Sequence, residues 1–279
     1  MDNNAENNLW ARYSRSLVKS FPRKNTRLKG VLEVFPPLAA EDRCLDIGTA
    51  SGGFALFFAQ IGNWIFVEPN ADHICAARKM LKGNFIQTDG ESFLREENQK
   101  FHLISALAIL FFIPDKERFF GLVRDRLAPG GQFIVSGDEN SGSSFFGPLR
   151  RALGIEAFTG GNHNVGYKDI RKFLEASGLG VRSVSRSTGP ATMAIQTALD
   201  GLLMAFSRMD AKSKNYKLTL PMTGETKRLR LKSLAHWPLR LLTEFCKLVD
   251  ALLWFLPRYD YVICAEVSNR QGVIMAREK

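Results

Sequence analysis

The chain has 279 residues, of which 45% are hydrophobic and 24% are charged. This composition supplies a sizeable core and excludes a globally disordered chain, and the length suits one large α/β domain with an insertion or two small domains. The formal net charge of +10 predicts attraction to an anionic partner, such as a membrane surface, a nucleic acid or a phosphorylated substrate. A solvated basic face without a specific partner is the simpler alternative.

Cysteine usage and the N-terminal residues indicate the compartment. Cys44, Cys75, Cys246 and Cys264 lack the spacing of a metal site or a redox pair, so we expect free thiols and no bound metal. Free thiols are typical of a reducing compartment. Residues 1–8 are polar and contain no apolar stretch of a signal peptide, so the sequence predicts a cytoplasmic protein.

An apolar pattern with helical spacing precedes the first predicted strand. Apolar residues from Leu28 to Phe35 recur at helical spacing, and Pro36 with Pro37 ends this pattern. We therefore expect residues 1–40 to form an N-terminal helical segment ahead of the first strand.

A glycine-rich turn follows the first predicted strand. Residues 44–47 form a short apolar run with one acid, Asp46, and a helix pattern at residues 54–60 follows the turn. Strand, turn and helix in this order begin a nucleotide-binding βαβ unit, because glycines let a ligand approach the backbone and the helix N-terminus offers unpaired N–H groups. The acid lies two residues before Gly48, where a carboxylate favours a cationic amine and repels a pyrophosphate. A tight turn without any ligand is the alternative.

Two further acids follow the next predicted strands. Glu68 ends the run of residues 64–68, about 20 residues beyond the turn, where dinucleotide-binding folds place a carboxylate that accepts hydrogen bonds from ribose hydroxyls. Asp89 follows a short strand predicted at residues 85–87. A helix cap ahead of Glu91 is the alternative role for Asp89.

The ordered set Asp46-x-Gly48-x-Ala50-x-Gly52, Glu68 and Asp89 resembles the signature of the class I S-adenosylmethionine-dependent methyltransferases. The family's turn carries glycine where this chain has Ala50, which is a mild departure if Ala50 keeps a negative φ. The resemblance implies that S-adenosylmethionine binds with Glu68 on its ribose and Asp89 on its adenine amino group. It assigns the cofactor to the following residues: Asp46, Gly48, Ala50, Gly52, Glu68, Pro69, Asp89, Gly90 and Ala106.

The family also guides the prediction of the acceptor site. After the fourth strand, predicted at residues 102–107, the family's Ile-Pro-Asp ending is retained at residues 113–115, but Phe111 and Phe112 stand where many members carry Glu-His. We therefore expect an unusually apolar acceptor pocket, with core packing of the two rings as the alternative. Asp138 leaves the fifth predicted strand at the edge where open α/β sheets bind ligands.

Three more residues are assigned to the acceptor side. Tyr13 resembles a tyrosine that many family members carry in a leading segment folded over the cofactor, and packing with Trp10 is the alternative. His163 and Tyr167 belong to a polar, glycine-rich loop over the same sheet edge, where His163 would act as a base or an orienting group. A solvated loop histidine is the alternative. The predicted acceptor-binding residues are thus Tyr13, Phe111, Phe112, Asp138 and Tyr167.

A long interruption separates the sixth and seventh predicted strands. The sixth begins at residues 180–184 and the seventh is expected at residues 259–267, so residues 190–256 form an insertion with two apolar helical patterns around a basic middle. Its last apolar run is too short and too charged for a transmembrane helix. The insertion either forms a lid that touches an anionic membrane surface or covers the sheet edge.

The predicted fold is therefore Rossmann-like α/β, with a doubly wound, mostly parallel seven-stranded sheet, helices on both faces and a single domain at residues 1–279. The leading function is methyl transfer from S-adenosylmethionine to a small, lipidic or lipid-linked acceptor, at the cytoplasmic membrane face if the insertion binds lipid. RNA methylation is one alternative, but residues 105–112 lack the Asp that ribose methyltransferases of the Lys-Asp-Lys-Glu type carry. A non-catalytic S-adenosylmethionine-binding scaffold protein is the other.

Overall fold

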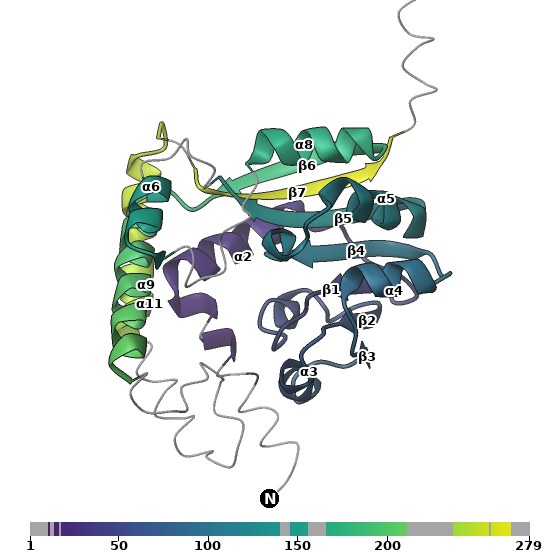
Figure 1. The fold of residues 1–279 in the computed structure, drawn as a ribbon, viewed down its shortest axis with the longest axis horizontal. Helices are drawn as coiled ribbons and strands as arrows, with labels where there is room; N and C mark the ends of the chain where they lie inside the picture. The colour runs from purple at the N-terminus through teal and green to yellow at the C-terminus, as the bar shows by residue number, and fades with distance from the viewer. Residues whose placement is uncertain are drawn as a thin grey trace, which may run out of the picture.

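The computed structural model describes residues 11, 14–16, 18–139, 146–155, 166–210, 237–256 and 258–268. Within these ranges seven strands form one sheet in the order β3-β2-β1-β4-β5-β7-β6 (Figure 1). β7 runs antiparallel to both neighbours, and the other strand pairs are parallel, so the predicted sheet is confirmed. The strands are β1 (Arg43–Ile47), β2 (Asn63–Val67), β3 (Asn84–Ile86), β4 (Phe101–Leu107), β5 (Leu127–Asp138), β6 (Leu179–Ser187) and β7 (Asp260–Val267).

Helices cover both faces of the sheet (Figure 1). α4, α5 and α8 pack into the hydrophobic cluster on one face, while α2, α3 and the short η1 turn pack into the cluster on the other. α9 and α11 lie outside α2, at one end of the sheet (Figure 1). The helical segments are α2 (Pro22–Val34), η1 (Ala55–Phe57), α3 (Ala71–Arg78), α4 (Gly90–Glu96), η2 (Leu110–Phe112), α5 (Lys116–Arg126), α6 (Phe146–Ala152), α8 (Tyr167–Ala176), α9 (Pro190–Asp210) and α11 (Trp237–Leu252).

The sequence of β1 follows from its place between two helical layers. Successive side chains of a strand point to opposite faces, so Leu45 and Ile47 enter one cluster and Cys44 enters the other. A parallel strand that is covered on both faces is apolar almost throughout. Asp46 is the exception, and it belongs to the site described below.

The crossover from β1 to β2 is not the helix predicted for residues 54–60. Only a single 3₁₀ turn forms there, at Ala55–Phe57. The crossover ends at Gly62, whose φ of +92° turns the chain into β2 at Asn63, and its apolar residues Ala55, Leu56 and Phe58 are buried without forming an α-helix. The apolar pattern also predicts a helix over residues 71–82, but α3 ends at Arg78 and the residues that follow lead the chain into β3.

The start of β5 also differs from the prediction. The sequence predicts a fifth strand over residues 132–136, after a stop at Pro129-Gly130-Gly131, but β5 begins at Leu127 and the Pro-Gly-Gly sequence lies inside the strand. Leu127 pairs with Phe101, but Gln132 already pairs with Leu103, so the extra residues of β5 form a bulge in the ladder.

The N-terminal helix α2 is tied to the sheet by buried ion pairs. Arg23 and Arg27 each contact the carboxylates of Asp138, at the end of β5, and Asp260, at the start of β7, over 2.6 to 2.8 Å. Burial alone would lower the pKa of Arg23, but the two carboxylates raise it above its ordinary value. Burial conversely opposes ionisation of Asp260, yet the two arginines hold its pKa well below the usual range. Four charges thus fix α2 against the ends of two strands.

The insertion between β6 and β7 supplies two helices that are locked together by a buried acid. Asp250 of α11 accepts hydrogen bonds from the backbone N–H groups of Ala191 and Thr192 and from the Thr192 hydroxyl, which caps the start of α9. A Cβ at Gly189 would lie 2.4 Å from the Asp250 carboxyl group, so only glycine allows this close approach. The basic middle of the insertion lies outside the described residues. No helix in the described ranges is long and apolar enough to span a membrane.

The fold makes a prediction about Asp260, which is fully buried at 0% exposure. Replacing it with alanine leaves two buried arginines short of one counter-charge, so Asp260→Ala should lower the free energy of unfolding by about 3–5 kcal/mol. Urea denaturation measures this change. The control is Glu266→Ala in the same strand, where a solvent-exposed pair with Arg182 at 3.1 Å predicts a loss below about 1 kcal/mol. Equal losses in the two variants would contradict the role of the buried cluster.

Candidate functional site

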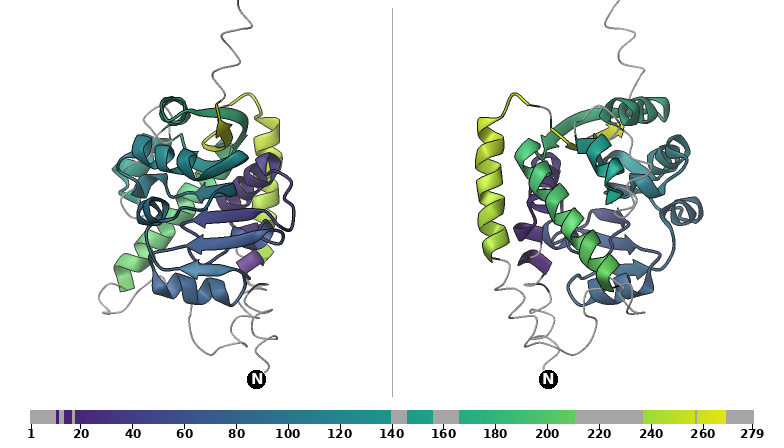
Figure 2. Two further views of the ribbon diagram at one scale, coloured as in Figure 1. Left: turned by 90° about the vertical axis from the view of Figure 1, so that its right-hand side faces the viewer. Right: turned by 60° about the vertical axis from the view of Figure 1, so that its left-hand side comes forward.

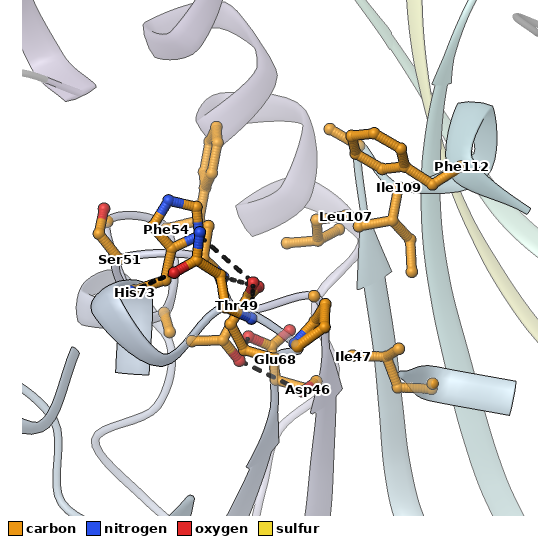
Figure 3. A pocket seen from close by; sticks show the side chains of 18 of the residues that line it. Asp46, Ile47, Thr49, Ser51, Phe54, Glu68, His73, Leu107, Ile109 and Phe112 are labelled. Atoms are coloured by element: carbon orange, nitrogen blue, oxygen red, sulfur yellow. Dashed lines mark hydrogen bonds and ion pairs between the residues drawn. The ribbon is translucent and has the colours of Figure 1, made fainter. Parts of the chain in front are cut away.

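A large cavity opens at the carboxyl ends of β1, β2 and β4, and its volume is about 780 Å³. Pockets for small ligands commonly range from about 300 to 1,000 Å³. Figure 3 shows that polar residues such as Glu68 and His73 gather on one side and that Ile109 and Phe112 stand across from them. Seven of the nine predicted cofactor residues line this cavity: Asp46, Gly48, Ala50, Glu68, Pro69, Asp89 and Gly90.

The turn after β1 brings the backbone to the floor of the cavity. The amide of Gly48 donates to the carbonyl of Val67 over 2.8 Å, which joins the turn to the end of β2. Gly48 has a φ of +73°, and a Cβ there would lie 2.4 Å from Cγ2 of Ile109. Glycine is therefore required at this position both for the backbone conformation and for the close approach of the loop after β4.

Glu68 connects this turn to the next strand. One of its carboxylate oxygens accepts from the Ala50 amide at 2.9 Å, and the other accepts from the Asn70 amide at 3.0 Å. His73 Nδ1 lies 3.3 Å from the second oxygen. Glu68 is only 7% exposed, so its orientation is set by these partners. A carboxylate accepts about four hydrogen bonds, which leaves capacity for the hydroxyls of a ligand.

Ala50 adopts a φ of +48°, so the condition under which alanine would be a mild departure from the family's glycine is not met. This left-handed conformation costs a non-glycine residue about 1–2 kcal/mol. The cost is offset because the conformation directs the Ala50 amide to the buried carboxylate of Glu68.

Asp46 is the buried acid of the site. Its carboxylate accepts hydrogen bonds from the hydroxyls of Thr49, at 2.8 Å, and Ser105, at 2.6 Å. Burial raises the pKa of Asp46, the two hydroxyls oppose this shift and the nearby charge of Glu68 adds to it, so that the pKa is about 6. A cation bound beside Asp46 would relieve the cost of ionising this carboxyl group.

Asp89 lies at the N-terminus of α4 and also lines the cavity. Its carboxylate accepts from the Ser92 amide at 2.9 Å, so the helix-cap alternative is confirmed. The hydrogen bond from this amide lowers the pKa of Asp89, which keeps the group anionic. The cap and a contact with a ligand are compatible, because a carboxylate has two oxygens.

The opposite side of the cavity is apolar. Phe112 at the end of η2 lines the cavity and remains 73% exposed. Its neighbour Phe111 packs against it with tilted rings, whose centroids are 4.2 Å apart, but lines a separate, small cavity. Further apolar lining comes from several elements and their flanks, and it includes Ile47, Val18, Phe54, Leu107, Ile109, Ile113 and Phe119.

Several predicted residues do not line the large cavity. Gly52 and Ala106 are buried behind it. The carboxylate of Asp138 is held by the two arginines of α2, and the ring of Tyr167 packs edge-on against Tyr261 at 5.8 Å. Contact of Asp138 and Tyr167 with an acceptor stays a prediction, and so does contact of Gly52 and Ala106 with the cofactor.

Two predicted residues and several unpredicted ones complete the account. Tyr13 and His163 lie outside the described residues. Ser14, Lys24 and His73 line the cavity without having been predicted. His73 follows Glu68 by five residues on the first turn of α3, and this placement beside a strand-ending acid is the signal that could have identified it.

The lining fits S-adenosylmethionine. An acid beside a tight turn suits a cationic amino group, a strand-ending carboxylate suits ribose hydroxyls, and the glycine turn leaves its backbone open to a ligand. Among the described residues no cluster of His, Cys, Asp and Glu side chains could hold a metal ion.

Comparisons with known proteins agree with this fit. A profile of the methyltransferase domain family matches residues 20–184. Comparison with curated protein sequences gives no match.

Three solved structures illustrate the shared fold. The [4+2]-cyclase SpnF has 15% identity and a TM-score of 0.57, over 88% of this chain and 82% of that one. An S-adenosylmethionine-dependent methyltransferase from Archaeoglobus fulgidus has 16% identity and a TM-score of 0.51, over 90% and 93%. Phosphoethanolamine N-methyltransferase 2 from Haemonchus contortus, solved with S-adenosylmethionine, has 13% identity and a TM-score of 0.51, over 87% and 52%.

At these identities the solved structures establish the fold alone, and the profile match over more than half of the chain establishes the family. The chain therefore belongs to the methyltransferase domain family and is a class I S-adenosylmethionine-dependent methyltransferase.

Proposed function

We propose that this enzyme methylates a small, lipidic or lipid-linked acceptor. The observation that carries the proposal is the composition of the cavity, in which the polar end with Asp46 and Glu68 faces a wall that includes the exposed ring of Phe112 (Figure 3). An apolar wall in contact with a bound acceptor favours acyl or isoprenoid chains, because burying apolar surface contributes about 25 cal/mol per Å².

The residues of the polar end would hold the cofactor in the manner expected from their chemistry. Glu68 would accept hydrogen bonds from the ribose hydroxyls. Asp46 would balance the positive charge of the amino group, and Asp89 would accept a hydrogen bond from the adenine amino group. S-adenosylmethionine supplies a methyl group on a positively charged sulfur. The chain's own contribution is to align the acceptor and to exclude water from that charge.

The titratable residues of the cavity favour a mechanism in which the enzyme aligns the acceptor with the methyl group and supplies no general base. Besides the three acids Asp46, Glu68 and Asp89, the titratable residues of the described lining are Lys24, His73 and Glu91. His73 is already engaged with Glu68. An acceptor that loses its proton after methylation needs no base in the reacting step.

Transfer of a labelled methyl group tests the proposal. The purified enzyme is incubated with labelled S-adenosylmethionine and cell extract, which is then separated into organic, RNA and protein fractions. Label in the organic fraction is the expected result. Label confined to the RNA or protein fraction would overturn the acceptor class.

Glu68 generates a prediction about cofactor binding. Glu68→Gln keeps the size of the side chain but removes its charge, so the affinity for S-adenosylmethionine should fall by about 1–3 kcal/mol. Isothermal titration calorimetry measures the loss. Glu96→Gln, an exposed residue at the end of α4, is the matched control and should bind like the wild type. An unchanged affinity of Glu68→Gln would remove Glu68 from the cofactor site.

The raised pKa of Asp46 predicts a pH-dependent affinity. With a pKa of about 6, most of this carboxyl group is protonated in the free enzyme at lower pH, and a cationic ligand then has to displace the proton. The affinity for S-adenosylmethionine should therefore be about tenfold weaker at about pH 5 than at about pH 7.5. Asp46→Asn should bind more weakly and with a nearly flat pH profile. A wild-type profile as flat as that of the variant would show that Asp46 does not compensate the ligand's charge.

A further inference from the structure

The outward face of α11 carries a continuous row of exposed apolar side chains. Trp237, Leu241, Phe245, Leu248 and Leu252 follow one another at intervals of four, four, three and four residues, and each is 60–69% exposed. These intervals place all five side chains on one side of a helix. Trp254 and Phe255, directly after the helix, are also exposed. We call these seven residues the outer stripe.

The outer stripe is not needed to hold α11 in place. The helix packs inward through a different and more polar face, on which Thr243, Cys246 and Asp250 are buried. The Thr243 hydroxyl donates to the carbonyl of Ser20 over 2.6 Å, and Asp250 caps α9. Figure 2 shows α11 at the periphery, with α2 and the remaining elements on one side of it. The rotation of α11 is thus fixed by polar contacts that leave its apolar side facing outward.

An apolar row of this size requires an occupant, and charge indicates which one. The segment 211–236, which immediately precedes Trp237 in the sequence, contains seven Lys or Arg residues and one Glu. Two copies of this chain meeting through their stripes would bring two such segments together, and like charges repel. An anionic surface would instead attract them, by about 1 kcal/mol for each basic residue close to it.

The aromatic residues point to the same partner. Trp237 and Trp254 lie at the two ends of the stripe, and tryptophan favours the boundary between lipid and water because its ring is apolar and its N–H is polar. α11 has 16 residues, which is fewer than the roughly 20 needed to span a bilayer. A helix of this kind lies along a membrane surface with one face inserted. We propose that the outer stripe docks the enzyme on the surface of an anionic lipid bilayer.

Docking would place the bilayer close to one wall of the cavity. Ser14 and Val18 line the cavity, and Ser20, two residues after Val18, is bonded to α11. A lipidic acceptor would then reach the cavity from the bilayer, and this link alone rests on the proposed function. The docking itself does not depend on which molecule is methylated.

Sedimentation with lipid vesicles tests the docking. The full-length enzyme is mixed with vesicles of phosphatidylcholine alone or of phosphatidylcholine with an equal part of phosphatidylglycerol. The wild type should sediment with the anionic vesicles and remain in solution with the neutral ones. The variant Phe245→Ser/Leu248→Ser should lose about tenfold or more of its partition into anionic vesicles, because two inserted side chains are removed.

The control replaces two exposed apolar residues outside the insertion, Leu32 in α2 and Ile61 before β2, with serine. Leu32→Ser/Ile61→Ser should partition like the wild type. Calorimetric titration with S-adenosylmethionine shows that both variants are folded, since no residue of the stripe lines the cavity. Equal partition of the stripe variant and the wild type would overturn the proposal. So would a wild-type dimer in sedimentation velocity that the stripe variant cannot form, because a second copy would then be the occupant.

The labelling experiment distinguishes the two proposals. Vesicle binding without label in the organic fraction would retain the docking surface and reject the lipidic acceptor. Label in the organic fraction without vesicle binding would do the reverse.

Discussion

One hydrogen bond, from the Ala50 amide to the Glu68 carboxylate, joins the two strands on which the cofactor end of the cavity is built. β1 and β2 run parallel with Ile47 beside Val67, so the turn after one strand and the acid after the other begin at the same level of the sheet. The register alone does not orient either group. The bond does so, because it holds a nearly buried carboxylate and a left-handed alanine in one arrangement. A charge-assisted bond of this kind is comparable in strength to the strain at Ala50, which explains why an alanine is tolerated where the family has glycine.

Buried polar groups also position the helices α2, α9 and α11. Because these contacts are polar, they leave apolar side chains of the helices exposed. The ion pairs of Asp260 hold α2, and Asp250 holds α9 against α11. Replacing one partner of such a buried contact is costly, so these contacts define orientation strictly. Two apolar surfaces stay largely exposed among the described residues, namely the cavity wall with Phe112 and the outer stripe of α11. Under the two proposals above, ligands of lipidic character would cover both.

The sequence predicted what depends on local pattern and missed what depends on distant contacts. The strands and the acids that end them follow from short apolar runs bounded by turns, so Asp46, Glu68 and Asp89 were found in the right places. The exposed side of α11 could not be read from its periodicity, because the helix buries Thr243 and Asp250 in preference to Phe245.

Charge pairing over long sequence separations was equally inaccessible. Asp138 was assigned to the acceptor because it ends a strand at the ligand edge, yet its partners are the two arginines of α2, more than 100 residues earlier. The helix predicted at residues 54–60 is wrong for a different reason. Its apolar pattern is real, since Ala55, Leu56 and Phe58 are buried, but burial of these side chains does not require an α-helix.

Burial links the chemistry of the two sides of the cavity. The low-dielectric surroundings that raise the pKa of Asp46 to about 6 also make its ionised form a stronger partner for a bound cation. An apolar acceptor seated against Phe112 and Ile109 would extend these surroundings, since it excludes water from the cavity. A methyl group on a positively charged sulfur becomes easier to transfer as solvation of that charge is removed, because the reaction disperses the charge. Under the proposed function, the apolar wall would therefore contribute to catalysis as well as to binding, and a polar side chain at position 112 would alter both together.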